Sequence, residues 1–158
     1  MKTYIAITLF LIFGTTYTYS QSKFELNVGV GFWEAISLKA KYGDQLQIGL
    51  AQGFAGFDFY QSSIELYYHF NFNRKSDPNQ TKLLSLYVMG GVGTTYLSKK
   101  FQNHITNFYP RLGLTINFSK KTGINLDFGP CASRIRNTDG NYYWSHSPSG
   151  SVHFFIRV

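Results

Sequence analysis

The chain has 158 residues, a net charge of +7 at pH 7 and a single cysteine. This length allows one domain, and a lone cysteine excludes an internal disulfide framework. Aromatic residues make up 18% of the chain, and charged residues only 15%, where about 25% is typical of soluble domains. Few charges are therefore available to cover a surface in water. The sequence contains no nucleic-acid-binding motif to accompany its basic charge, so nucleic acid is not an expected partner.

The first twenty residues differ from the rest and predict a cleavable signal peptide at 1–20. Lys2 precedes an apolar run at 4–13, and small residues follow at the spacing that signal peptidase favours, with cleavage expected after Ser20. The competing interpretation is a membrane-spanning helix, but about ten apolar residues are half of the roughly 20 that such a helix needs. Cleavage would leave 21–158 as one domain with a net charge of +6, because only Lys2 is lost from the total of +7.

The remaining sequence alternates apolar and polar residues with a period of two, which predicts an all-β body. No stretch after residue 20 keeps apolar residues at helical spacing. Turn residues such as Gly43-Asp44 and Asp77-Pro78-Asn79 separate the alternating segments. We expect eight strands, at residues 24–32, 36–42, 45–51, 63–72, 84–96, 107–118, 124–131 and 152–158.

The volume of the apolar side chains decides which face of these strands lies inside. An eight-stranded barrel encloses room only for a packed interior or one small ligand. The bulky apolar face cannot fit within it, whereas the opposite face is rich in Gly, Ser, Asn and Thr. We therefore expect an inverted barrel, with its apolar face against lipid and its polar face inside. Only helices and closed barrels satisfy every backbone polar group in hydrocarbon.

Charges on the polar face nearly cancel, and a buried charge needs a partner because an unpaired one costs several kcal/mol or more. The pattern predicts a salt-bridged network that fills the lumen. Its members would be Glu25, Lys39, Lys41, Glu65, Arg111, Asp127 and Arg157.

The signal peptide, the eight strands and the ending Val152-His153-Phe154-Phe155-Ile156-Arg157-Val158 together resemble the small eight-stranded outer-membrane β-barrel proteins of Gram-negative bacteria. The resemblance covers essentially all of 21–158 and rests on pattern, without a catalytic motif. It implies an antiparallel up-and-down transmembrane barrel in the cell outer membrane, and recognition of the last strand by the barrel-insertion machinery. The family usually ends in an aromatic residue, most often Phe, whereas this chain ends in Val158.

The family topology implies that both chain ends face the periplasm. The 74–82 connection would then be a long periplasmic turn. The outward loops would lie at 33–35, 53–61, 97–106 and 133–150, the last being the longest. If function is carried by loops, these segments would hold it.

We expect a non-enzymatic barrel, monomeric and without cofactor or metal, that acts as a membrane scaffold or as a binding protein through its surface loops. A water-filled pore is not expected, because wide channels need about 16 strands or more. Its partners would be outer-membrane lipid and lipopolysaccharide. Basic residues that would stand above the outer leaflet form a candidate lipopolysaccharide site, with solvated loop charges as the alternative reading. They are Lys99, Lys100, Arg134 and Arg136.

Two other functions stay open. Some eight-stranded barrels are lipid A deacylases, which would need Ser147 close to His146 or His153 and an acid to orient the base. The local sequence does not match the expected deacylase pattern, and no acid is clearly placed. The other alternative is a secreted soluble barrel that binds a small apolar ligand.

Three further features have ordinary explanations. The four histidines, His69, His104, His146 and His153, match no ligand spacing for a metal. The Gly90-Gly91-Val92-Gly93 stretch lies in a strand with no helix after it, so it is not a phosphate loop and would permit close packing. Cys131 is expected to be an inert lumen residue.

Overall fold

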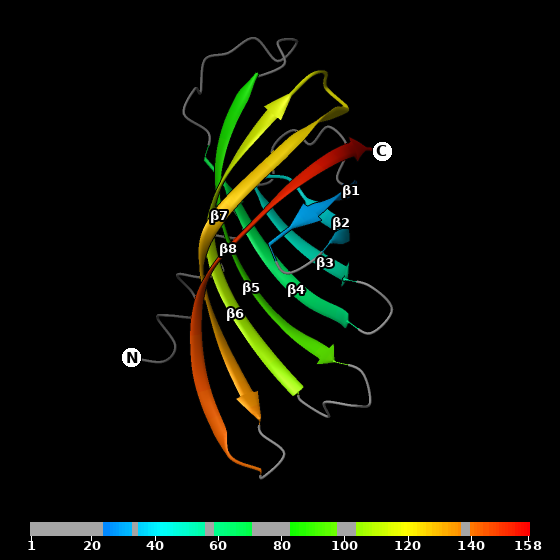
Figure 1. Cartoon of the computed structure of the whole chain (residues 1–158). Coiled ribbons are helices and arrows are strands. Elements are labelled where there is room, and N and C mark those ends of the chain that lie inside the picture. Colours follow the sequence, from blue (N-terminus) through cyan, green and yellow to red (C-terminus); the bar gives the residue numbers. More distant parts are fainter. Residues whose placement is uncertain (1–23, 33–34, 56–58, 71–82, 98–103, 137–139) are drawn as a thin grey trace, which may run out of the picture.

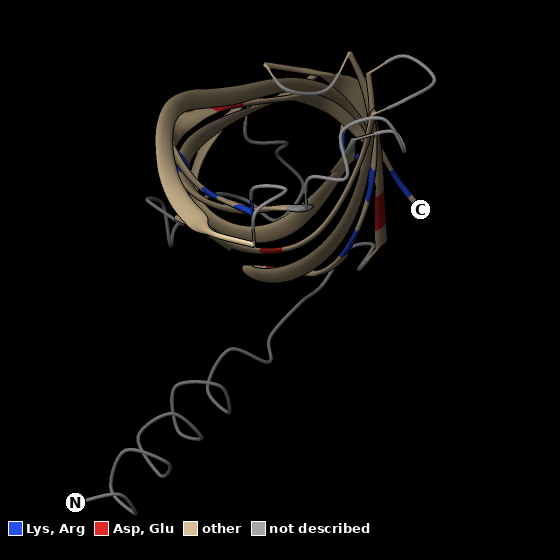
Figure 2. Cartoon of the chain, turned by 60° about the horizontal axis from the view of Figure 1, so that its bottom comes forward, with Lys and Arg blue, Asp and Glu red and all other residues tan. Residues whose placement is uncertain are grey.

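The computed structural model describes residues 24–32, 35–55, 59–70, 83–97, 104–136 and 140–158. These residues form a closed antiparallel barrel in up-and-down order, which confirms the predicted all-β, eight-stranded barrel (Figures 1 and 2). The predicted signal peptide and the 74–82 connection lie outside the described residues. The eight strands are β1 (Phe24–Gly31), β2 (Ile36–Gly43), β3 (Leu46–Phe54), β4 (Phe59–His69), β5 (Leu84–Leu97), β6 (His104–Asn117), β7 (Thr122–Arg136) and β8 (Tyr142–Arg157).

Each strand pairs with the next along the chain, and β8 pairs with β1 to close the ring. Following paired residues once round the barrel from Ile156 leads back to β8 at His146, ten residues earlier. A stagger of this size tilts the strands by about 40° from the barrel axis. The path runs through Leu26, Ala40, Leu50, Ile64, Val92, Phe108 and Ala132.

The barrel has two ends, which we name by the chain segments found there. The hairpin rim is the end where β1 leads to β2, β3 to β4, β5 to β6 and β7 to β8. The terminal rim is the opposite end, where β1 begins and β8 ends.

Burial alternates along every strand in the sense that the sequence predicts. Leu26, Leu50 and Ile64 are each about half exposed on the outward face, at 48%, 62% and 55%, whereas Glu25 and Glu65 on the inward face are 2% exposed. The barrel is thus apolar outside and polar inside.

Aromatic rings fill the interior by lying against glycines on the neighbouring strand. Tyr109 pairs with Gly91, and Tyr87 pairs with Gly113. A Cβ placed on Gly91 would lie 2.2 Å from the Tyr109 ring, and one on Gly113 would lie 2.0 Å from the Tyr87 ring. Only glycine leaves room for these rings, so Gly91 and Gly113 are packing positions. The close packing that the sequence predicts for the Gly90–Gly93 stretch holds for Gly91 and Gly93, whereas a Cβ on Gly90 would meet no atom within 4 Å.

The seventh and eighth strands are longer than predicted. Residues 133–150 were expected to form the longest outward loop, but β7 continues to Arg136 and β8 begins at Tyr142, with paired residues throughout. Pro130 and Pro148 lie within these strands, although proline lacks the N–H of a ladder hydrogen bond. The prolines pair with each other across β7 and β8, and the β7–β8 hairpin extends the barrel wall at the hairpin rim (Figure 1).

Other strand ends differ by fewer residues. β3 runs on to Phe54, β4 begins at Phe59, and β6 begins at His104. Within the described residues, no helix has both the length and the apolar character needed to cross a membrane.

Candidate functional site

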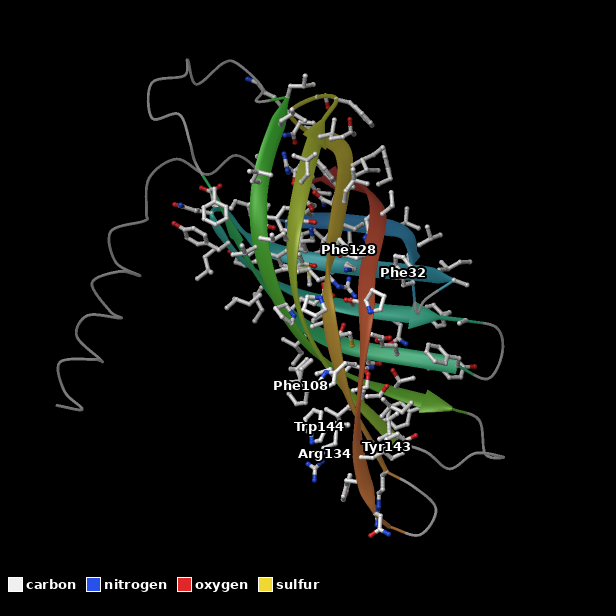
Figure 3. All side chains as sticks on the ribbon, turned by 60° about the vertical axis from the view of Figure 1, so that its left-hand side comes forward. Phe32, Phe108, Phe128, Arg134, Tyr143 and Trp144 are labelled. Atoms are coloured by element: carbon white, nitrogen blue, oxygen red, sulfur yellow. The ribbon has the colours of Figure 1, made fainter. Side chains whose placement is uncertain are left out.

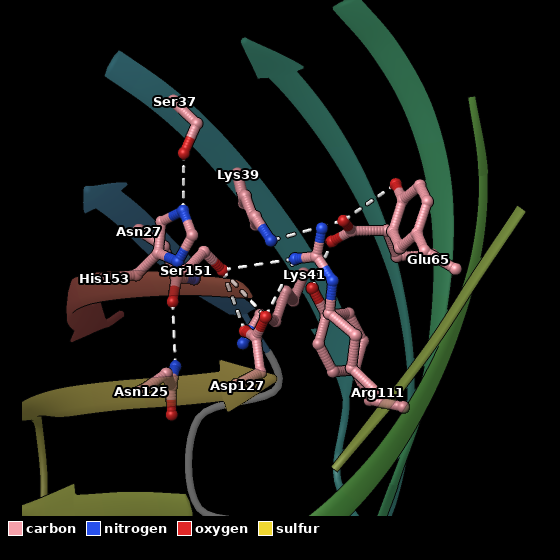
Figure 4. Close-up of polar contacts among 12 residues, drawn as sticks. Asn27, Ser37, Lys39, Lys41, Glu65, Arg111, Asn125, Asp127, Ser151 and His153 are labelled. Carbon is pink, nitrogen blue, oxygen red and sulfur yellow. Dashed lines mark hydrogen bonds and ion pairs between the residues drawn. The ribbon is translucent and has the colours of Figure 1, made fainter. Parts of the chain in front are cut away.

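The interior brings together all seven charged residues that the sequence assigns to a lumen network. Figure 4 shows Lys39, Lys41, Glu65, Arg111 and Asp127 among them. Six of them are buried, and the side chain of Arg157 is 22% exposed. We call these seven residues the lumen network. They form three clusters, each built around one carboxylate.

The Glu25 cluster lies toward the terminal rim. One carboxylate oxygen, Oε1, accepts hydrogen bonds from Lys41 Nζ and Asn125 Nδ2, each at 3.1 Å. The other, Oε2, accepts a hydrogen bond from Arg157 Nε at 2.9 Å. The cluster thereby joins β1 to β2, β7 and β8.

The Glu65 cluster lies deeper in the barrel. Glu65 Oε1 accepts hydrogen bonds from Lys39 Nζ at 3.2 Å and from the Tyr109 hydroxyl at 3.1 Å. The Tyr67 hydroxyl donates to Oε2. Lys39 and Tyr109 come from β2 and β6, neither of which is adjacent to β4, so these contacts cross the interior.

The Asp127 cluster joins β7 to β5, β6 and β8. Arg111 Nη1 donates to Oδ1 at 2.8 Å, and the Ser151 hydroxyl lies 2.9 Å from both carboxylate oxygens. The Tyr87 hydroxyl donates to Oδ2 at 3.2 Å. Arg111 also donates through Nε to the Ser149 hydroxyl at 3.0 Å.

All three carboxylates thus combine a cationic partner with at least one neutral hydrogen-bond donor. Removing one partner of such a buried pair is costly, because it leaves a charge without compensation in a low dielectric. The clusters also link strands that are not neighbours in the sheet, so they cross-brace the barrel. The described interior is therefore packed and polar.

Several partners of the network were not predicted from the sequence. Tyr67, Tyr87 and Tyr109 supply hydroxyls to the carboxylates, and Asn125 and Ser151 complete two of the clusters. The sequence does place the three tyrosines and Asn125 on the polar face, whereas Ser151 precedes the predicted last strand. The contacts that these residues make follow only from the register between neighbouring strands. That register places Tyr109 opposite Gly91 and Tyr87 opposite Gly113.

The candidate basic site is described only in part. Lys99 and Lys100 lie outside the described residues. Arg134 and Arg136 lie on β7, both exposed on the outward face near the hairpin rim, and not in a loop as the sequence suggested. Arg134 Cζ is 4.0 Å from the centre of the Tyr142 ring, and Arg136 Cζ is 5.9 Å from it.

The residues considered for catalysis do not come together. His146 and Ser147 are consecutive in β8, so their side chains point to opposite faces of the sheet. Ser147 and His153 share the inward face but are six residues apart, about 20 Å along the strand. His153 Nε2 instead forms a hydrogen bond with the Ser37 hydroxyl, and both residues are buried.

His69 and the cysteine have local partners, and the side chain of His104 lies outside the described residues. His69 lies 3.0 Å, Nε2 to Oε1, from Gln47. Cys131 is a buried free thiol whose Sγ lies 3.7 Å from the Ser133 hydroxyl. Nowhere in the described part of the chain do three or more His, Cys, Asp or Glu side chains gather as metal ligands would.

Comparison of the chain with protein-family models found no match. Comparison with curated proteins found none either.

Proposed function

We propose that this protein is an integral outer-membrane β-barrel with a sealed polar interior, which serves as a non-enzymatic membrane scaffold and contacts lipid and surface partners at its hairpin rim. The observation that carries the proposal is the distribution of side chains on the outward face. A mainly aliphatic band, which also holds the exposed rings of Phe128 and Phe154, lies between two belts of exposed aromatic residues, as in outer-membrane barrels.

The two belts follow the two rims. At the hairpin rim the exposed aromatic side chains are Phe32, Tyr60, Tyr96, Phe108, Tyr142 and Trp144, and at the terminal rim they are Phe24, Tyr42, Tyr68 and Phe118. Outer-membrane barrels place such rings at the two membrane interfaces, where one part of the ring meets hydrocarbon and another part meets water.

The distance between the belts supports a membrane location. Phe24 and Phe32 are eight residues apart, as are Tyr60 and Tyr68. With a rise of about 3.3 Å per residue and a tilt of about 40°, eight residues rise roughly 20 Å along the barrel axis. This is close to the apolar band of about 25 Å that outer-membrane barrels present to lipid.

The packed interior supports a scaffold in preference to a pore or a carrier. The described interior is lined by ion pairs and tyrosine hydroxyls, a lining that does not suit an apolar ligand. The separation of His146, Ser147 and His153 gives no support to a deacylase built on those residues.

The test is to express the full chain in a Gram-negative host and separate its membranes. We expect the protein in the outer-membrane fraction, resistant to extraction by sodium carbonate, and migrating faster on a gel without heating than after boiling. Recovery of the processed protein in the aqueous fraction without detergent would refute the proposal.

A further inference from the structure

Arg134 and Arg136 interrupt a wall that is otherwise free of formal charge. Among the described outward-facing residues of the eight strands, they are the only Lys, Arg, Asp or Glu side chains. Both are exposed on β7 near the hairpin rim. Two cations are thus concentrated where the apolar wall ends.

Aromatic rings surround the two arginines and orient at least one of them. The Arg134 guanidinium stacks over Tyr142, and Arg134 pairs across the strands with Trp144. Trp144 in turn packs against Phe108, with ring centres 6.1 Å apart, and these side chains project from the same face of the sheet (Figure 3). A guanidinium stacked on a ring keeps its in-plane N–H donors free for the forked hydrogen bonds that a phosphate accepts.

An apolar groove of about 790 Å³ lies below these residues, on the side toward the middle of the barrel. This volume falls within the roughly 300–1,000 Å³ of typical ligand pockets. Val88, Leu112 and Phe128 form its apolar wall, and the compact rings of Pro110, Pro130 and Pro148 leave the hollow between them.

The prolines make the groove a feature of the backbone as well as of the side chains. The pairing of β6 with β7 passes from Phe108–Ala132 to Leu112–Phe128, and Pro110 and Pro130 face each other in between. Neither proline has an N–H to donate, so the hydrogen-bond ladder is interrupted at this point.

From this juxtaposition we propose that the outward face of β6, β7 and β8 binds a phosphorylated lipid, with its phosphate on Arg134 and Arg136 and an acyl chain in the groove. This inference rests on the proposed function, because the face must lie in a lipid leaflet. Arg134 and Pro130 are four residues apart, about 13 Å along the strand. The arginines select an anionic headgroup, and the groove selects a lipid over a soluble anion.

The test measures lipid binding to the purified full-length processed protein by native mass spectrometry in detergent. The probes are diphosphoryl lipid A, zwitterionic phosphatidylcholine and inorganic phosphate. We expect lipid A to bind in preference to phosphatidylcholine, and millimolar inorganic phosphate not to displace it. Replacing both arginines, Arg134→Gln with Arg136→Gln, should weaken lipid A binding roughly 30-fold.

Two matched controls separate the site from general charge and general packing. Lys120→Gln with Lys121→Gln removes the same charge from exposed residues at the terminal rim and should leave lipid A binding unchanged. Val88→Phe places a ring in the groove and should weaken lipid A binding, whereas Ile48→Phe on the outward face of β3, away from the groove, should not.

The proposal is overturned if the arginine variant binds lipid A like the wild type, or if the two lysine replacements weaken binding equally. It is also overturned if chemical cross-linking yields a dimer that depends on the two arginines while lipid A binding does not depend on them. The face would then hold a second copy of the chain. Gel migration of each variant separates these outcomes from failure of the proposed function. A heat-modifiable barrel in the outer membrane without arginine-dependent lipid binding refutes only this inference.

Discussion

Replacing Glu65 by Gln tests whether the lumen network stabilises the barrel through paired charges. The substitution keeps the size of the side chain and one acceptor oxygen, which can serve either Tyr67 or Tyr109, but it removes the negative charge opposite Lys39. The Lys39 and Glu65 side chains are each 2% exposed and their charged atoms lie 3.2 Å apart. Breaking such a pair costs about 3–5 kcal/mol, because it leaves one charge buried and uncompensated.

The measurement is the free energy of unfolding of the detergent- or lipid-embedded barrel in guanidinium chloride, followed by gel shift and tryptophan fluorescence. Adding Lys39→Met to Glu65→Gln removes the orphaned ammonium and should recover most of the loss. Arg157→Gln, at the more exposed position of the network, should cost less. A Glu65→Gln loss below about 1 kcal/mol, or a double variant as unstable as the single one, would contradict the reasoning.

Three further predictions concern packing and permeability. Gly113→Ala should destabilise the barrel by about 1–3 kcal/mol, because the new Cβ would overlap the Tyr87 ring, whereas Gly90→Ala, with no atom within 4 Å of the new Cβ, should change stability little in the same unfolding assay. Cys131, 4% exposed, should resist a water-soluble maleimide in the folded barrel and react after denaturation, and equal labelling rates in both states would show that the interior is open. The reconstituted protein should produce no stepwise current in a planar bilayer, and reproducible conductance steps abolished by Lys41→Met would mean that the lumen is a channel.

The fold and the orientation of its faces were predictable because the alternation has a period of exactly two. Residues such as Leu50 and Glu65 must then face opposite ways, and volume alone assigns the apolar face to the outside. The membership of the lumen network followed from the same alternation, because a charged residue on the polar face of a strand must point into the barrel.

The partners within the network were not predictable, because they depend on the stagger of ten residues round the barrel. That stagger brings Lys39 to Glu65 and Arg111 to Asp127, and no local signal in the sequence encodes it. The extent of β7 and β8 was missed for a different reason. After Cys131 and before Val152, the outward positions include Arg134, Arg136 and His146, so the alternation of apolar and polar residues that marks the other strands is lost there.

The pairing of β1 with β8 also constrains how this chain matures. Glu25 and Arg157 are 132 positions apart in the sequence, yet they share a hydrogen bond at the seam that closes the ring. The barrel cannot close until the final strand has been synthesised. Until then, each intermediate has two sheet edges with unpaired backbone N–H and C=O groups and an exposed apolar face. Such intermediates aggregate readily. The topology therefore leaves the chain exposed to association with its neighbours until its last strand pairs with its first.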